Sequence, residues 1–169
     1  MTKPCTVDVM AALMNRYETG KWVKIPEAST PSGRRCDLVA FGIWRNTKNR
    51  IIGHEVKVSR ADWQKELDSP EKSDAVIPFC HSWFIVAPKG LIQLEELRAS
   101  WGLLEMLPSG SMKIRRQAEI QKDVKPLPPR IIGEWMRRIE QRTTSSTVVD
   151  AIVKTKFENL KASYEARSD

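Results

Sequence analysis

Histidine and cysteine are scarce in this 169-residue sequence, and it contains no long apolar run. The three cysteines, Cys5, Cys36 and Cys80, are widely spaced and form no C-x-x-C pair. An odd, scattered set of cysteines argues against a disulfide framework and fits a reducing compartment. No segment approaches the roughly 18 apolar residues that a membrane span needs, and the N-terminus lacks the apolar core of a signal peptide. We therefore expect a cytoplasmic protein with free thiols and no membrane association.

The two histidines, His54 and His81, together with Cys36 and Cys80, match no spacing of a structural zinc site. Internal repeats and low-complexity tracts are also absent. We expect buried thiols and ordinary histidines rather than a zinc centre.

Charge is plentiful and unbalanced. Charged residues make up 29% of the chain and hydrophobic residues 41%, which is typical of a soluble globular protein. The formal net charge of +7 favours polyanionic partners such as nucleic acid or an anionic membrane surface. Charge alone does not show whether the protein binds nucleic acid.

Apolar periodicity and turn residues predict an alternation of helices and strands. Ser59, with Asp62 three residues later, has the form of a capping box and marks the start of a helix. The predicted helices cover Thr6–Tyr17, the segment between Ser59 and Pro70, Glu71–Ile77, Arg130–Gln141 and Thr147–Ala166. The predicted strands cover Trp22–Glu27, Cys36–Trp44, the run that begins at Ile51, Ser82–Pro88, and a hairpin around Pro108–Gly110.

The order of these elements predicts an α/β fold, a mixed sheet flanked by helices. The strands on either side of the polar turn Asn46–Asn49 are expected to pair as an antiparallel hairpin. The strand, helix and strand that follow imply a right-handed crossover and a parallel pair. The length suits one domain with a single core.

Three charged residues interrupt strands that should otherwise be apolar: Asp37, Glu55 and Lys57. Buried charges cost several kcal/mol unless they are paired or bind an ion. Side chains alternate along a strand, so Glu55 and Lys57 share one face while His54 takes the other. Counting back from the turn places Asp37 near the level of Glu55 and Lys57, to within a register slip of one or two residues.

Two carboxylates that face each other repel unless a cation lies between them. Oxygen ligands from Asp37 and Glu55 suit Mg²⁺ or Mn²⁺. A metal is one explanation for the three charges, and a structural ion pair at a strand end is the other.

The pattern resembles the PD-(D/E)XK nuclease superfamily. Asp37 precedes a hairpin, Glu55-Val56-Lys57 follows it, and a capped helix and the apolar strand SWFIVAP come next. The stretch EVKVSRADW, followed by PEKSD and SWFIVAP, is similar to small phage and bacterial members that include the MmcB-like DNA-repair proteins. The resemblance covers roughly Thr6 to Arg116, and Cys36 stands where the superfamily often has proline.

The resemblance implies a restriction-endonuclease-like core of αβββαβ order, with a β-hairpin extension and C-terminal helices. It implies a nuclease-like domain over 1–122 and a helical extension over 123–169. Asp37, Glu55 and the main-chain carbonyl of Val56 would bind Mg²⁺ or Mn²⁺, and Lys57 would orient the attacking water. The activity implied is hydrolysis of DNA phosphodiester bonds in repair, recombination or phage DNA processing, in the cytoplasm of a bacterial cell.

Further residues are weaker candidates. Additional acids near the metal could come from Glu27 or Glu18, and contacts with a phosphate or water from Gln64 or Lys72. The residues expected to bind DNA are Arg34, Arg35, Arg60, Lys113, Arg115 and Arg116. No motif for sequence-specific recognition accompanies them.

Two other functions compete with the nuclease. One is a catalytically inactive relative that binds DNA or a repair or recombination partner, and the other is an interaction protein in which the three charges are merely structural. The sequence leaves open whether the protein is a homodimer and which DNA structure it prefers.

Overall fold

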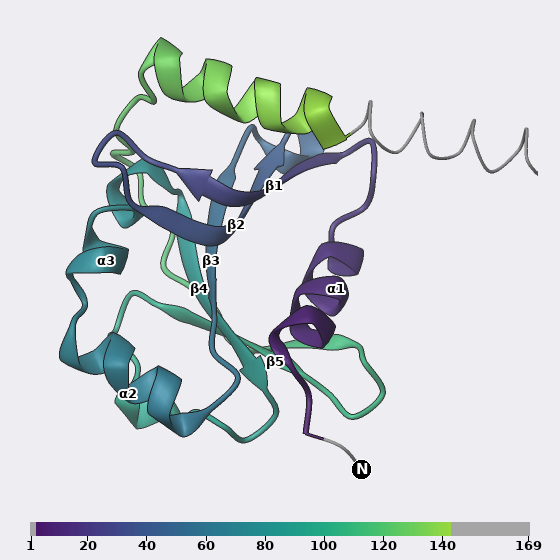
Figure 1. Cartoon of the computed structure of the whole chain (residues 1–169), viewed down its shortest axis with the longest axis vertical. Helices are drawn as coiled ribbons and strands as arrows, with labels where there is room; N and C mark the ends of the chain where they lie inside the picture. Colours follow the sequence, from purple (N-terminus) through teal and green to yellow (C-terminus); the bar gives the residue numbers. More distant parts are fainter. Residues whose placement is uncertain (1–2, 143–169) are drawn as a thin grey trace, which may run out of the picture. The chain divides into compact units, whose positions relative to one another are not determined.

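A six-stranded mixed sheet, in the order β1-β2-β3-β4-β5-β6, organises the chain (Figure 1). The structure is a computed structural model that describes residues 3–142. It divides the chain into two compact units, Met1–Ile131 and Ile132–Asp169. The strands all belong to the first unit: β1 (Trp22–Ser29), β2 (Arg35–Gly42), β3 (Ile51–Val56), β4 (Ser82–Pro88), β5 (Gly102–Met106) and β6 (Met112–Arg116).

The strand pairing confirms the predicted α/β fold with a mixed sheet. β1, β2 and β3 form an antiparallel meander, β3 and β4 are parallel, and β5 and β6 form the predicted hairpin. The parallel pairing of β4 with β5 was not predicted. The only helix between β4 and β5 is a three-residue 3-10 helix, Leu94–Glu96. The sequence therefore has no helical periodicity there that could indicate a crossover.

Helices flank both faces of the sheet, with α1 (Thr6–Arg16) on one side and α2 (Arg60–Asp68) and α3 (Glu71–Asp74) on the other (Figure 1). The predicted helix Glu71–Ile77 is shorter than expected. α3 ends at Asp74 and a separate 3-10 turn, Ile77–Phe79, follows. Pro78 cannot donate a helical hydrogen bond and disfavours the helical conformation of the residue before it.

A helix over 129–142 agrees with the predicted helix Arg130–Gln141. The predicted helix Thr147–Ala166 lies outside the described residues. None of the helices within 3–142 has the length and apolarity to cross a membrane.

The two faces of the sheet bury different side chains. On the α1 face, Val9 and Leu13 pack into one cluster with Leu38, Val56 and Val86. Because side chains alternate, Glu55 and Lys57 point to the opposite face, toward α2 and α3. The alternation therefore separates an apolar layer under α1 from a layer that carries the charged residues.

His54 lies on the α1 face, away from Glu55, as predicted. It is fully buried. Its Nδ1 donates to the main-chain carbonyl of Leu38 (3.1 Å), and its Nε2 therefore accepts from the hydroxyl of Tyr17 (2.7 Å). The neutral imidazole joins α1 to β3 and leaves no nitrogen to ligate a metal.

Acidification is expected to weaken the fold through His54. Burial lowers the pKa of His54 to about 4, which outweighs the hydrogen bond to Leu38, and the nearby Arg16 lowers it further. Between the ordinary value of 6.5 and about 4 only the unfolded chain binds the proton, so stability falls as the pH falls through this window. Urea denaturation of wild type should lose about 3 kcal/mol across it relative to His54→Gln. Parallel curves for the two proteins would contradict this assignment.

Candidate active site

The candidate site lies where β2 and β3 stop pairing. Leu38 and His54 are the last partners in the β2–β3 register, so Asp37 and Glu55 come next along the two strands. The main-chain N–H of Val56 has no main-chain partner on β2 here. It donates instead to the side chain of Asp37, whose Oδ2 lies 2.6 Å away. The Asp37 side chain thus replaces a ladder hydrogen bond and ties β2 to the Glu55-Val56-Lys57 segment.

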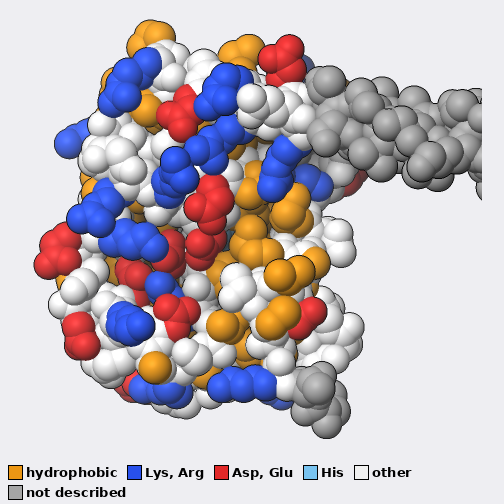
Figure 2. Space-filling view, viewed as in Figure 1, with side chains coloured by type: hydrophobic (Ala, Val, Ile, Leu, Met, Phe, Trp, Pro, Cys, Tyr) orange, Lys and Arg blue, Asp and Glu red, His pale blue; other side chains and the backbone are white. Residues whose placement is uncertain are grey.

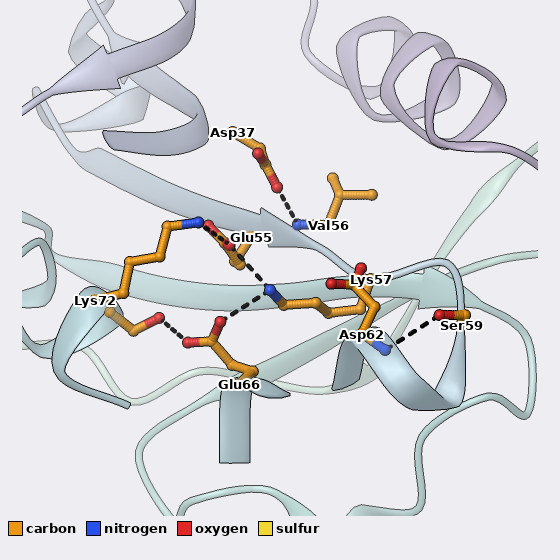
Figure 3. Close-up of polar contacts among 9 residues, drawn as sticks. Asp37, Glu55, Val56, Lys57, Ser59, Asp62, Glu66 and Lys72 are labelled. Atoms are coloured by element: carbon orange, nitrogen blue, oxygen red, sulfur yellow. Dashed lines mark hydrogen bonds and ion pairs between the residues drawn. The ribbon is translucent and has the colours of Figure 1, made fainter. Parts of the chain in front are cut away.

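One oxygen of the Glu55 carboxylate accepts hydrogen bonds from two ammonium groups. Lys57 Nζ and Lys72 Nζ each lie 3.0 Å from Glu55 Oε1 (Figure 3). Glu55 and Lys57 are almost completely buried, with side-chain exposures of 3% and 7%, whereas Lys72 on α3 is 47% exposed. The structure therefore brings Asp37, Glu55, Lys57 and Lys72 together, and it adds a second cation to the predicted three residues.

Glu66 on α2 is a site residue that the sequence analysis missed. Its Oε2 lies 2.9 Å from Lys57 Nζ (Figure 3). Its Oε1 accepts a hydrogen bond from the Ser73 hydroxyl. Glu66 and Ser73 are both buried. Glu66 follows the buried Trp63 by three residues and so shares the inward face of α2; that spacing was the available signal.

The start of α2 explains how Glu66 meets Lys57. Ser59, three residues after the end of β3, is the N-cap of α2, and its Oγ accepts a hydrogen bond from the main-chain N–H of Asp62 (3.1 Å). The predicted return bond from Asp62 is not among the contacts of the described residues. This sharp turn folds α2 back over the sheet face on which Lys57 lies.

Burial is the main cause that raises the pKa of both acids, Asp37 and Glu55. Burial raises the pKa of Asp37, although the bond from Val56 and the two lysines oppose it. Burial and the negative charge of Asp37 raise the pKa of Glu55, again against the lysines. Burial lowers the pKa of Lys57, but Glu55 and Glu66 outweigh it and hold that pKa above the ordinary value. Lys57 is therefore charged, and the negatively charged forms of Asp37 and Glu55 are less favourable than those of exposed carboxylates.

Asp37 and Glu55 are the two side chains that could together hold a divalent cation here, with other ligands supplied by water or phosphate. Glu55 and Glu66 contact the ammonium groups of Lys57 and Lys72, whereas Asp37 accepts from the main chain of Val56. Asp37 Oδ1 and Glu55 Oε2 accept no hydrogen bond from the described residues. Within 3–142 no group of three His, Cys, Asp or Glu side chains is arranged to hold a metal. Mg²⁺ usually binds one or two carboxylates and completes its shell with water or phosphate, and this arrangement would allow that.

Two of the weaker candidates lie close to these residues. Lys72 contacts Glu55 directly. Glu27 lies on β1 between the partners of Leu38 and Cys36, and its charge raises the pKa of Asp37. Glu27 also has a φ of 51°, in a region that residues other than glycine rarely occupy and that often marks functional positions.

The structure does not bring Glu18 or Gln64 to the site. Glu18 pairs with Lys21 (2.7 Å) beside the first residue of β1, at the end of the β1–β2 pair farther from Asp37. Gln64 is exposed on α2 and donates to Asp68 (2.9 Å).

The six predicted DNA-binding residues fall into two classes. Arg60 is engaged in two bonds to Glu96 (2.6 and 2.7 Å), and Arg116 donates to the carbonyls of Leu94, Arg98 and Trp101. The other four are exposed: Arg34, Arg35, Lys113 and Arg115. Arg34 and Arg35 immediately precede Cys36 and Asp37, so they lie nearest to the carboxylates along the chain.

Basic and acidic side chains intermix on the face shown in Figure 2. On this face, the excess of positive charge therefore does not form one continuous basic patch. Trp63 is fully buried and donates its Nε1–H to Glu96 (3.2 Å), so it packs in the core and is not exposed to stack on a base. Cys5, Cys36 and Cys80 are all free thiols, as expected.

Comparison with known proteins shows the fold and no more. No family model matches the sequence, and no curated protein matches it. A solved structure of a protein of unknown function from Silicibacter pomeroyi is similar, with a TM-score of 0.56 and 22% identity. The match covers 83% of this chain and 85% of that chain.

Removing Glu66 is expected to destabilise the fold strongly. Glu66→Ala would leave Lys57 with one carboxylate and Ser73 without its acceptor, both in a buried setting. Loss of one partner from a buried ion pair typically costs about 3 kcal/mol. Urea denaturation should show a loss of this size, while Glu95→Ala, at an exposed position on the 3-10 helix, should change stability by less than about 0.5 kcal/mol. Equal small effects would mean that the Glu66 contacts contribute little.

Proposed function

We propose that the protein is a metal-dependent nuclease of the PD-(D/E)XK type that hydrolyses DNA phosphodiester bonds. The observation that carries the proposal is the bond from the main chain of Val56 to Asp37, because it fixes the aspartate against the Glu-x-Lys segment. An aspartate, a glutamate and a lysine held in this way on two strands are the residues such a nuclease needs.

The arrangement of elements supports the same proposal. A helix, a three-stranded antiparallel meander, a helix and a parallel strand follow in the order of the restriction-endonuclease-like core. The charged residues emerge at the end of the meander, between β2 and β3. The hairpin of β5 and β6 would extend this core on the far edge of β4.

Asp37 and Glu55 would hold the cation, with the main-chain carbonyl of Val56 as a third oxygen. When bound, Mg²⁺ or Mn²⁺ supplies Lewis acidity to the attacking water and to the phosphodiester. Lys57 would hold the water by donating a hydrogen bond from its ammonium group. The same positive charge would stabilise the negative charge that develops on the phosphate oxygens during attack. Glu66 would keep the Lys57 side chain pointing into the site.

The proposal that DNA is the substrate rests on the charge of the protein. The net charge of +7 favours a polyanion, and the exposed Arg34 and Arg35 lie just before Asp37, at the start of β2. Contacts of this kind bring affinity for phosphates without sequence recognition. The setting would be DNA repair, recombination or phage DNA processing.

A catalytically inactive relative that binds DNA or a protein partner is the second candidate. The observation in its favour is that Glu55 pairs with two ammonium groups, those of Lys57 and Lys72, which can balance its charge. In that case Asp37, Glu55 and Lys57 would serve only to join β2, β3 and α2.

Cleavage assays separate the two functions. Purified protein is incubated with labelled single-stranded, duplex, flapped and mismatched DNA in Mg²⁺ or Mn²⁺. We expect cleavage of at least one substrate, its loss in EDTA, and a fall of at least about 100-fold in Lys57→Ala, since that variant removes a positive charge from the transition state.

The matched control for this assay is Lys65→Ala, which removes an exposed lysine on α2 that, within residues 3–142, makes no hydrogen bond or ion pair with the site residues. It should cleave like wild type. DNA that is bound but never cut, with equal binding by wild type and Lys57→Ala, would contradict the nuclease and favour the inactive relative.

A further inference from the structure

The two lysines on Glu55 Oε1 are held differently. Both ammonium groups lie 3.0 Å from the same oxygen. Lys57 is buried and has a second carboxylate partner in Glu66, 2.9 Å away. Lys72 is half-exposed, and its ammonium contacts no carboxylate other than Glu55 among the described residues. Loss of Glu55 as a partner would therefore leave Lys57 in place and release Lys72.

We infer that Lys72 is a displaceable counter-cation of Glu55, which holds the divalent-cation site in the metal-free protein and is released when the cation binds. This inference rests on the proposed metal site. It assigns to Lys72 a competitive role that goes beyond a contact with phosphate.

Electrostatics gives the reason for the displacement. Two ammonium groups and a divalent cation on one carboxylate would repel one another at close range. The buried carboxylates gain from a cation because burial disfavours their charged forms. Lys72 has the least to lose on leaving, because its side chain is already about half in water. Only the Lys72 end of this ion pair reaches solvent, since Glu55 is buried, and water can replace Glu55 as a partner of the ammonium group.

The released lysine would then be free to bind an anion. Lys72 lies on α3, directly beside the site, so its ammonium would stay near the phosphate of a bound nucleic acid strand. Metal binding would thereby increase the affinity of the site for phosphate, and by linkage phosphate would increase the affinity for metal.

The test is a calorimetric titration of the full chain with Mn²⁺ alone, in the absence of DNA. Lys72→Met should bind Mn²⁺ about fivefold more tightly than wild type, because the competing charge is gone. Lys72→Arg, which keeps the charge, should restore the affinity of wild type. Lys65→Met removes one positive charge from an exposed position on α2 and should not change the affinity. Circular dichroism checks that each variant is folded.

Acetylation of lysines, quantified by mass spectrometry, reports the displacement directly. The modification rate of Lys72 should rise when Mn²⁺ is added, whereas Lys57 should stay protected and Lys65 should stay unchanged. Equal Mn²⁺ affinities for wild type and Lys72→Met, with no change in Lys72 acetylation, would overturn this inference and leave the metal site standing. If none of the proteins binds Mn²⁺, both this inference and the proposed metal site are wrong.

Discussion

Burial of the Lys57 ammonium between two carboxylates is the constraint on which the site depends. A buried charge is tolerated only when it is well paired, and Lys57 meets this condition through Glu55 on β3 and Glu66 on α2. The pair fixes the distance between the sheet and α2, and the Ser59 cap fixes where that helix begins. The same charged residues form the proposed site, so the fold and the proposed function depend on one set of contacts.

Asp37 extends the constraint to the neighbouring strand. Its carboxylate takes the N–H that the parting of β2 and β3 leaves without a strand partner. The apolar layer on the opposite face, with His54 fixed between Tyr17 and Leu38, holds these strands against α1. Two carboxylate oxygens, Asp37 Oδ1 and Glu55 Oε2, accept no hydrogen bond from the described residues, and the proposed nuclease chemistry requires such oxygens to bind the cation.

Much of this arrangement could be predicted from the sequence because the informative signals are local. Alternation placed Glu55 and Lys57 on one face, and the short turn before β3 fixed the hairpin register closely enough to bring Asp37 beside them. Glu66 and Ser73 were missed because their importance depends on how α2 and α3 fold over the sheet. The pairing of β4 with β5 and the engagement of Arg60 by Glu96 depend in the same way on contacts between distant segments. Glu18 does not lie at the site. Its position just before β1 in the sequence does not specify which end of β1 is near Asp37.

The central claim is that Asp37 and Glu55 form a divalent-cation site. The most direct measurement is anomalous diffraction from a crystal soaked in Mn²⁺. The account predicts an anomalous peak between the two carboxylates, within bonding distance of an oxygen of each, and its absence from crystals of Asp37→Asn. A structure of wild type with Mn²⁺ bound elsewhere, or with no peak at these carboxylates, would contradict the account.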